Sequence, residues 1–192
     1  MIEKIKTWDE HLFLWLNSFH VDWLDVVMFQ LSQTLIWVPF YAILVYFIYR
    51  SDPKNSWWVF GGIALTILIS DQVTSGLMKP YFERLRPCHD ERWSDIIYNY
   101  RRCGGLFGFA SSHAANTFGL AVFLNLKMKG NLRFLPWLFL WAAVISYTRI
   151  YLGVHYPMDI IVGALVGSAA GGISWFIIVY IKREILKLIL KD

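Results

Sequence analysis

Long apolar segments separated by short charged clusters dominate this sequence and restrict what it can fold into. They cover about residues 25–49, 57–78, 112–126, 132–152 and 157–180, and most are close to the roughly 20 residues that cross a bilayer. With 57% hydrophobic and only 17% charged residues over 192 positions, the chain is too apolar for a soluble domain. We therefore expect one all-α membrane domain over residues 1–192, a polytopic bundle of about five transmembrane helices.

The first twenty residues follow a different pattern. Apolar side chains recur there at three- and four-residue spacings with charges between them, at Ile5, Trp8, Leu12, Trp15, Leu16 and Phe19. This spacing predicts an amphipathic helix lying in the membrane interface over residues 1–20. The interleaved charges also argue against a cleavable signal peptide, so we expect the chain to be used whole.

The net charge of +4 indicates topology rather than nucleic-acid binding, because the basic residues cluster at the ends of apolar segments. With five spans, the loops that hold Arg50 and Lys127 share a side with the basic tail, residues 182–192. The two sides carry equal numbers of Lys and Arg when every such residue is counted. When the candidate site cations, named below, are left out, the side of the basic tail carries more. We therefore expect a cytoplasmic tail and an extracytoplasmic loop over residues 80–110.

That loop is long for a compact membrane protein, which favours a functional role. It contains Cys88 and Cys103, the only cysteines in the chain. The pair could close a disulfide in an oxidising compartment, and two free thiols are the alternative.

Asp71, Ser75 and Lys79 follow one another at four-residue steps, so they share one helical face. An ionisable residue at membrane depth usually faces protein or water, which directs this face to the bundle interior. We favour a hydrogen-bonding role over a catalytic one for Asp71.

The stretch from Thr148 to Asp159 holds a cation, a titratable ring and a carboxylate at the boundary of two apolar segments. Pro157 suits the first turn of a helix, which puts His155 just before the helix and Asp159 just inside it. The carboxylate can then approach the imidazole. The alternative is a membrane-edge loop with interfacial polar residues.

Three segments, residues 79–87, 110–113 and 149–159, each begin or end a span and share one membrane face. Lys79, Arg86 and Arg149 supply cations, and Arg presents paired N–H donors to phosphate. Ser111 and Ser112 open a helix whose free N–H groups suit an anion. Singly, such residues could be snorkelling cations or helix caps, but together they predict a phosphate site.

These motifs, Lys-x6-Arg-Pro, Ser-x-His and Arg-x5-His-x3-Asp, resemble those of the type 2 phosphatidic acid phosphatase (PAP2) family. The resemblance covers residues 79–159. Ala110 and Ser112 stand where the family has Pro and Gly, and Thr148 replaces Ser. Ser112 still offers a backbone N–H and Thr148 keeps a hydroxyl, so neither change removes a group that the chemistry requires.

The resemblance implies a phosphohistidine mechanism that needs neither metal nor cofactor. His155 would be the nucleophile, Asp159 would orient it, and His113 would be the general acid and base. The phosphate would be bound by Lys79, Arg86, Ser111, Ser112 and Arg149.

The expected function is a lipid phosphatase of the bacterial cytoplasmic membrane, with undecaprenyl diphosphate ranked first as substrate. Phosphatidylglycerophosphate, phosphatidate and a lipid A phosphate are the alternatives, and the oligomeric state stays open. Two alternatives come from other functional classes: a vanadium haloperoxidase-like enzyme and a non-catalytic lipid-binding protein. We interpret the remaining histidines as interfacial or loop residues: His11, His20 and His89. Four further arginines of the loop either attract an anionic head group or form a solvated loop face: Arg84, Arg92, Arg101 and Arg102.

Overall fold

The computed structural model describes residues 2–100 and 103–190, and the regular structure in this part of the chain is helical. The helices are α1 (Ile2–Asn17), α2 (Asp22–Ser32), α3 (Val38–Ser51), α4 (Ser56–Asp71), α5 (Lys79–Phe82), α6 (Ser112–Lys127), α7 (Trp137–Tyr151) and α8 (Pro157–Ile189). A π-helix, Gln72–Met78, joins α4 to α5, and short 3-10 turns occupy Thr34–Trp37, Pro87–His89 and Glu91–Trp93.

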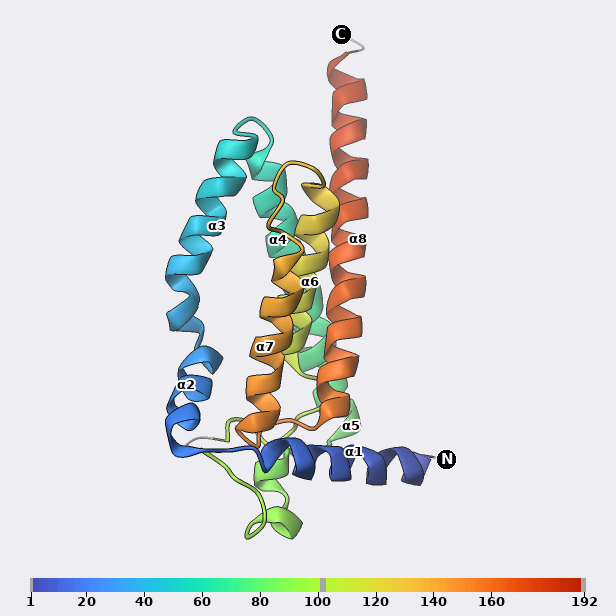
Figure 1. Ribbon diagram of the computed structural model, residues 1–192. Coiled ribbons are helices and arrows are strands. Elements are labelled where there is room, and N and C mark those ends of the chain that lie inside the picture. The colour runs from blue at the N-terminus through green and yellow to red at the C-terminus, as the bar shows by residue number, and fades with distance from the viewer. Residues whose placement is uncertain (1, 101–102, 191–192) are drawn as a thin grey trace.

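Helices α3, α4, α6, α7 and α8 run alongside one another as a bundle, and α1 lies across one end of it (Figure 1). Residues 83–100 and 103–111 and the loop before α8 lie at the α1 end, whereas the last turns of α8 lie at the other end. This arrangement confirms the predicted all-α membrane bundle.

Within the described residues, three helical stretches are long and apolar enough to cross a membrane: Thr34–Ser51, Ser56–Phe82 and Pro157–Ile189. Helices α6 and α7 have only 16 and 15 residues, so each is about 23 Å long and shorter than a hydrocarbon core of about 30 Å. The bundle thus has the expected five long helices, but only three of them have the usual dimensions of a span.

The first apolar segment is not one helix, contrary to the expectation of a continuous span over residues 25–49. Helix α2 ends at Ser32, Gln33 is extended with φ −85° and ψ 131°, and α3 starts after a 3-10 turn. Pro39 lies in the first turn of α3, where its missing N–H costs nothing. Farther into a continuous helix its ring would clash with a preceding carbonyl, so the chain breaks before it.

Helices α6 and α8 pack with their backbones in close approach because α8 carries glycines four residues apart on that face. A Cβ on Gly167 would lie 1.9 Å from the Ala115 carbonyl oxygen, and one on Gly163 would lie 2.4 Å from that of Ser111. No larger side chain fits at either position. This contact sets the start of α6 against the start of α8.

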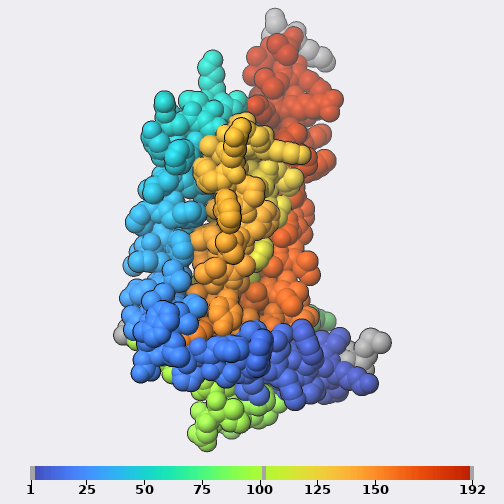
Figure 2. Space-filling model, viewed as in Figure 1, coloured from blue at the N-terminus to red at the C-terminus, as the bar shows by residue number. Residues whose placement is uncertain are grey.

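Helix α1 packs on the bundle through a narrow face of Asp9, Phe13 and Asn17, all buried. The apolar stripe seen in the sequence points elsewhere, since Trp8 and Trp15 are 54% and 59% exposed. The space-filling view shows α1 as a strip across the end of the bundle (Figure 2). That the exposed stripe lies in the lipid interface remains a prediction.

Candidate active site

His155 and Asp159 form a buried pair at the start of α8. The ring Nδ1 is 3.2 Å from Asp159 Oδ2, which also accepts the Tyr156 backbone N–H at 3.0 Å. Pro157 occupies the first turn of the helix, as predicted, so the carboxylate in that turn reaches back to the ring. Because Asp159 Oδ2 accepts a hydrogen bond from the Nδ1–H group, the lone pair of the ring is left on Nε2.

Arg86 covers that second ring nitrogen. Its Nη1 lies 3.1 Å from His155 Nε2 and donates to the Val154 carbonyl at 3.3 Å. Burial, together with the positive charges of Arg86 and Arg149, holds the pKa of His155 well below its ordinary value. The imidazole is therefore neutral and nucleophilic at Nε2.

Lys79 meets the start of α6 through hydroxyl groups. Its ammonium donates to Ser112 Oγ at 2.8 Å and to Ser75 Oγ at 3.2 Å, and Thr74 Oγ1 is 2.9 Å from the same Ser112 oxygen. One turn deeper, Asp71 accepts from Asn116 Nδ2 at 3.1 Å. The predicted shared face of Asp71, Ser75 and Lys79 therefore does point inward, towards α6.

Ser111 is the N-cap of α6, and its Oγ accepts the Ala114 N–H at 3.4 Å. Its own N–H donates to the backbone carbonyl of Asp159 at 2.9 Å. This bond ties the start of α6 to the first turn of α8. Ser111 is completely buried, and its carbonyl also accepts the Ala115 N–H at 3.0 Å.

Arg86, His113 and Arg149 border a cavity of about 590 Å³ at the loop end of the bundle. The Nε atoms of both arginines are buried and have no hydrogen-bond partner within the described residues. Unpaired guanidinium nitrogens around an open space suit an anion. His155 lies behind Arg86, so the ring is reached only when that side chain moves.

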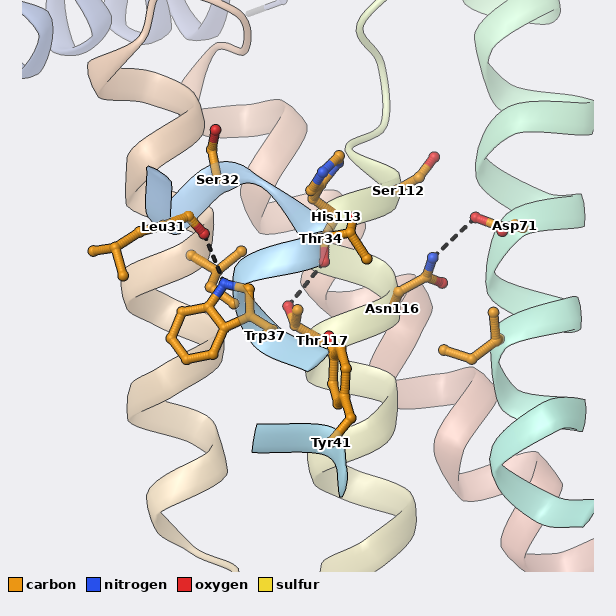
Figure 3. Close-up of a pocket in the computed structure, with 12 residues that line it drawn as sticks. Leu31, Ser32, Thr34, Trp37, Tyr41, Asp71, Ser112, His113, Asn116 and Thr117 are labelled. Atoms are coloured by element: carbon orange, nitrogen blue, oxygen red, sulfur yellow. Dashed lines mark hydrogen bonds between the residues drawn. The ribbon is translucent and has the colours of Figure 1, made fainter. Parts of the chain in front are cut away.

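A second cavity of about 360 Å³ shares Ser32 and His113 with the first and is lined by Ser112, Asp71 and Asn116 (Figure 3). A third, of about 250 Å³, continues from it past Asn116 between α3, α4, α6 and α7, where its walls are mostly aliphatic and aromatic. The space beside His113 thus begins polar and ends apolar.

Two residues outside the three motifs contact the Asp159 carboxylate or its partner. Arg84 donates to Asp159 Oδ1 at 2.9 Å and to Asp9 Oδ2 at 2.6 Å. The expectation that Arg84 attracts a head group or lies on a solvated face was therefore wrong. The signal for Asp9 was available in its four-residue spacing to Phe13 and Asn17, which marks a second face of α1.

The expectation for the other loop arginines has different outcomes. Arg92 is exposed and pairs with Asp90 and Glu10 at 2.6 and 2.9 Å, as a solvated loop residue does. Arg101 and Arg102 lie outside the described residues. His20 stacks on Tyr98 with ring centroids 4.0 Å apart, in agreement with a loop role.

Cys88 and Cys103 are joined by a disulfide, with their Cα atoms 5.9 Å apart. The Cys88 N–H donates to the Gly153 carbonyl at 3.1 Å, which attaches the bridged loop to the segment before His155. Gly153 has φ +73°, and a Cβ there would lie 2.7 Å from the Tyr98 carbonyl oxygen, so only glycine fits.

Comparison with known proteins extends the likeness to most of the chain. The sequence profile of the PAP2 superfamily matches residues 57–183. The lipid A 4'-phosphatase of Bacteroides thetaiotaomicron is 41% identical over 186 residues, 92% of this chain and 80% of that protein. That of Porphyromonas gingivalis is 34% identical over 189 residues, 95% of this chain and 78% of that protein.

Two crystal structures of membrane phosphatases share the fold. Aquifex aeolicus LpxE superposes with a TM-score of 0.63 at 27% identity, over 85% of this chain and 92% of that one. A PAP2-type phosphatidylglycerolphosphate phosphatase from Bacillus subtilis gives a TM-score of 0.65 at 19% identity, over 95% of this chain and 88% of that one.

The comparisons change the order of the expected substrates. An undecaprenyl-diphosphatase of Sulfolobus acidocaldarius is 28% identical over 150 residues, 76% of this chain and 65% of that protein. The two lipid A 4'-phosphatases thus match more of the chain, at higher identity, than this undecaprenyl-diphosphatase does; undecaprenyl diphosphate was placed first from the sequence and a lipid A phosphate among the alternatives. The motifs could not rank them, because they contact the phosphate that both lipids carry.

Proposed function

The chain belongs to the PAP2 superfamily, and from that premise we propose that this membrane lipid phosphatase removes the phosphate monoester of a sugar-headed lipid of the lipid A type. The proposal draws on the two lipid A 4'-phosphatases that match more than nine tenths of the chain. It rests most on one feature of the site, the polar side chains of Asp71, Ser112 and Asn116 in the cavity on the His113 side.

That cavity would receive the group from which phosphate is cleaved. Asp71 and Asn116 line it, and Asn116 Oδ1 is buried without a hydrogen-bond partner in the described residues. A sugar offers hydroxyl and amide groups that match such side chains, and acyl chains could continue into the apolar cavity beyond. A prenyl diphosphate would instead place a second phosphate near the Asp71 carboxylate, which repels it.

In the proposed reaction, the substrate phosphate enters between Arg86 and Arg149, and Arg86 exchanges its bond to His155 for one to a phosphate oxygen. Nε2 of His155 attacks phosphorus while the bond to the sugar oxygen breaks, and His113 gives that oxygen a proton. Asp159 stabilises the positive charge that develops on the ring.

The second half of the reaction regenerates the free enzyme. His113, now deprotonated, takes a proton from water, and the resulting hydroxide attacks the phosphohistidine. The phosphorus–nitrogen bond breaks, inorganic phosphate leaves, and the electron pair returns to Nε2. Lys79 and the N–H groups at the start of α6 neutralise phosphate oxygens throughout, in the roles assigned to Ser111 and Ser112 by the family motifs.

We place the site on the extracytoplasmic face of a bacterial cytoplasmic membrane, with the C-terminus in the cytoplasm. The Cys88–Cys103 bond supports this orientation, because disulfides persist in oxidising compartments. The basic residues of the opposite loops and of α8 support it as well.

The test is phosphate release by purified protein from a panel of lipids presented in matched mixed micelles. The panel contains lipid A bearing only a 4'-phosphate, lipid A bearing only a 1-phosphate, undecaprenyl diphosphate, phosphatidylglycerophosphate and phosphatidate, with His155→Gln as the blank. We expect the 4'-phosphate to be released fastest and a chelator to leave that rate unchanged. Fastest release from undecaprenyl diphosphate, or release from no lipid, would contradict the proposal.

A further inference from the structure

We propose that Asp9 and Arg84 are positioning residues of this phosphatase, which link the surface helix α1 to the catalytic pair and adjust the charge beside His155. The inference rests on the proposed function of His155 and Asp159. Neither Asp9 nor Arg84 belongs to the three phosphatase motifs.

Arg84 is held between two carboxylates that come from opposite ends of the sequence. One terminal nitrogen donates to Asp159 Oδ1 at 2.9 Å and the other to Asp9 Oδ2 at 2.6 Å. The guanidinium also stacks over the Tyr156 ring, 4.0 Å from its centroid. Three contacts therefore fix its position, which Lys could not reproduce with a single ammonium.

Asp9 is fixed as well. It is 1% exposed, and its second oxygen accepts the Met158 N–H at 2.8 Å in the first turn of α8. Burial raises the pKa of Asp9, and the charge of Arg84 opposes that rise. Helix α1 therefore holds both the start of α8 and the arginine that contacts the catalytic carboxylate.

The bonds of Asp159 show what this arrangement does. Oδ2 faces the His155 ring and the Tyr156 N–H, and Oδ1 faces Arg84. Both oxygens are thus occupied, so the carboxylate cannot rotate away from the ring without breaking a charged hydrogen bond. Arg84 in this way sets the direction of Asp159, which in turn sets the tautomer of His155.

Charge gives Asp9 a separate role. Arg84 alone would neutralise Asp159 and weaken its stabilisation of the positive ring that forms during attack. Asp9 supplies a second negative charge, so the group of two carboxylates and one guanidinium keeps a net charge of −1 beside His155. Removal of that charge, with the side-chain shape kept, should slow attack more than it weakens substrate binding.

The test compares Asp9→Asn with Glu10→Gln. Glu10 is the adjacent residue of α1 and pairs with a loop arginine, Arg92, at 2.9 Å, so it offers the same kind of contact without a link to Asp159. We expect Asp9→Asn to lower kcat about 10- to 100-fold, the usual size for loss of an outer hydrogen-bond partner, with KM within about twofold. Glu10→Gln should leave both unchanged.

Nitrogen NMR of the His155 ring provides a readout that a purely structural role would not change. In Asp9→Asn the ring should protonate at a lower pH than in wild type, because a nearby negative charge is gone. Arg84→Lys serves as the second variant should Asp9→Asn not fold, and it should lower kcat with little change in KM.

A folded Asp9→Asn with wild-type kcat would overturn the inference. An unchanged titration of the His155 ring in Asp9→Asn, together with a lower melting temperature of that variant, would overturn it as well. If Asp9→Asn does not fold, wild-type kcat in Arg84→Lys would overturn it. An inactive wild type would instead refute the proposed function.

Discussion

The two halves of the site are built in opposite ways. On the His155 side, His155, Asp159 and Asp9 are each at most 1% exposed; His155 bonds to Asp159, and Asp9 accepts from Arg84 and the Met158 N–H. On the other side, Arg86, Arg149 and His113 border open cavities, and both arginines keep a buried nitrogen without a partner in the described residues. The hydrogen bonds of the His155 half are formed before substrate binds, whereas the other half keeps donors that substrate could fill.

The difference follows from what each half must do. The attacking ring needs one tautomer and one direction, so its partners are best locked in advance by packing and hydrogen bonds. The phosphate and its lipid must enter and leave, so the arginines that would bind them keep Nε donors without a partner in the described residues. Buried unpaired donors cost free energy in the empty protein, and an anion recovers it when it binds.

The largest expected effect belongs to the locked half. His155→Gln should abolish turnover, and Asp159→Asn should reduce kcat on the order of 10⁴-fold, because the ring loses the acceptor that selects its tautomer. Steady-state phosphate release with the preferred lipid measures both. Asp90→Asn, which alters an acid that contacts Arg92 at the surface, is the matched control and should remain active. Activity of Asp159→Asn within tenfold of wild type would remove Asp159 from the mechanism.

The second prediction separates the halves by stability. Arg149→Met should lower kcat about 10²- to 10³-fold, since it removes donors to the phosphate oxygens, yet leave the empty protein as stable or more stable. Arg84→Met should destabilise the fold by about 3 kcal/mol, because Asp9 and Asp159 remain buried without their partner.

Thermal unfolding in detergent measures this pair, with Arg133→Met as the control for removal of an exposed arginine from the opposite loop side. Equal destabilisation by Arg149→Met and Arg84→Met would mean that the two halves are not built differently.

A smaller effect is expected deeper in the open half. Asn116→Ala should raise KM about tenfold for a sugar-headed substrate, the size of one lost hydrogen bond, and leave KM for phosphatidate nearly unchanged. The measurement is KM for both lipids with the same protein preparation. Asn125→Ala, at an amide in α6 that donates to the Ala121 and Leu135 carbonyls, is the control for general disturbance of the helix. An equal rise for both lipids would show that Asn116 supports the helix rather than the head group.

The smallest effect concerns the protonation of His155. Because burial and Arg86 lower its pKa, the folded ring stays neutral at pH 6, where a free imidazole with pKa about 6.5 is mostly protonated. The unfolded chain then binds a proton that the native state does not, so stability falls as pH drops below about 6.5. Nitrogen NMR of the ring, identified by its loss in His155→Gln, should show a neutral imidazole protonated at Nδ1. A cationic ring at pH 6 would contradict a buried His155 with a lowered pKa.

Sequence reasoning reached the site because its motifs are local and their spacings carry chemistry. Pro157 placed Asp159 in a first turn, four residues after His155, and the structure has that pair in contact.

Sequence reasoning failed where the link is not local. Asp9 and Arg84 lie 75 residues apart, and no periodic pattern connects them. The break before α3 was missed because hydropathy over residues 25–49 is continuous even though the backbone at Gln33 is not helical. The motifs alone could not rank the lipids, because they contact only the phosphate, whereas the cavities that would hold the rest arise from side chains on α2, α3, α4, α6 and α7.

The central claim is that His155 carries the phosphoryl group of a sugar-headed lipid between attack and hydrolysis. The direct measurement mixes purified protein with lipid A labelled only in its 4'-phosphate, quenches in base within one turnover, and locates the label by peptide mass spectrometry. The account predicts an acid-labile phosphoryl group on the peptide that contains His155, lost in His155→Gln and retained in Glu10→Gln. Release of phosphate without a labelled His155, or a label on another residue, would contradict it.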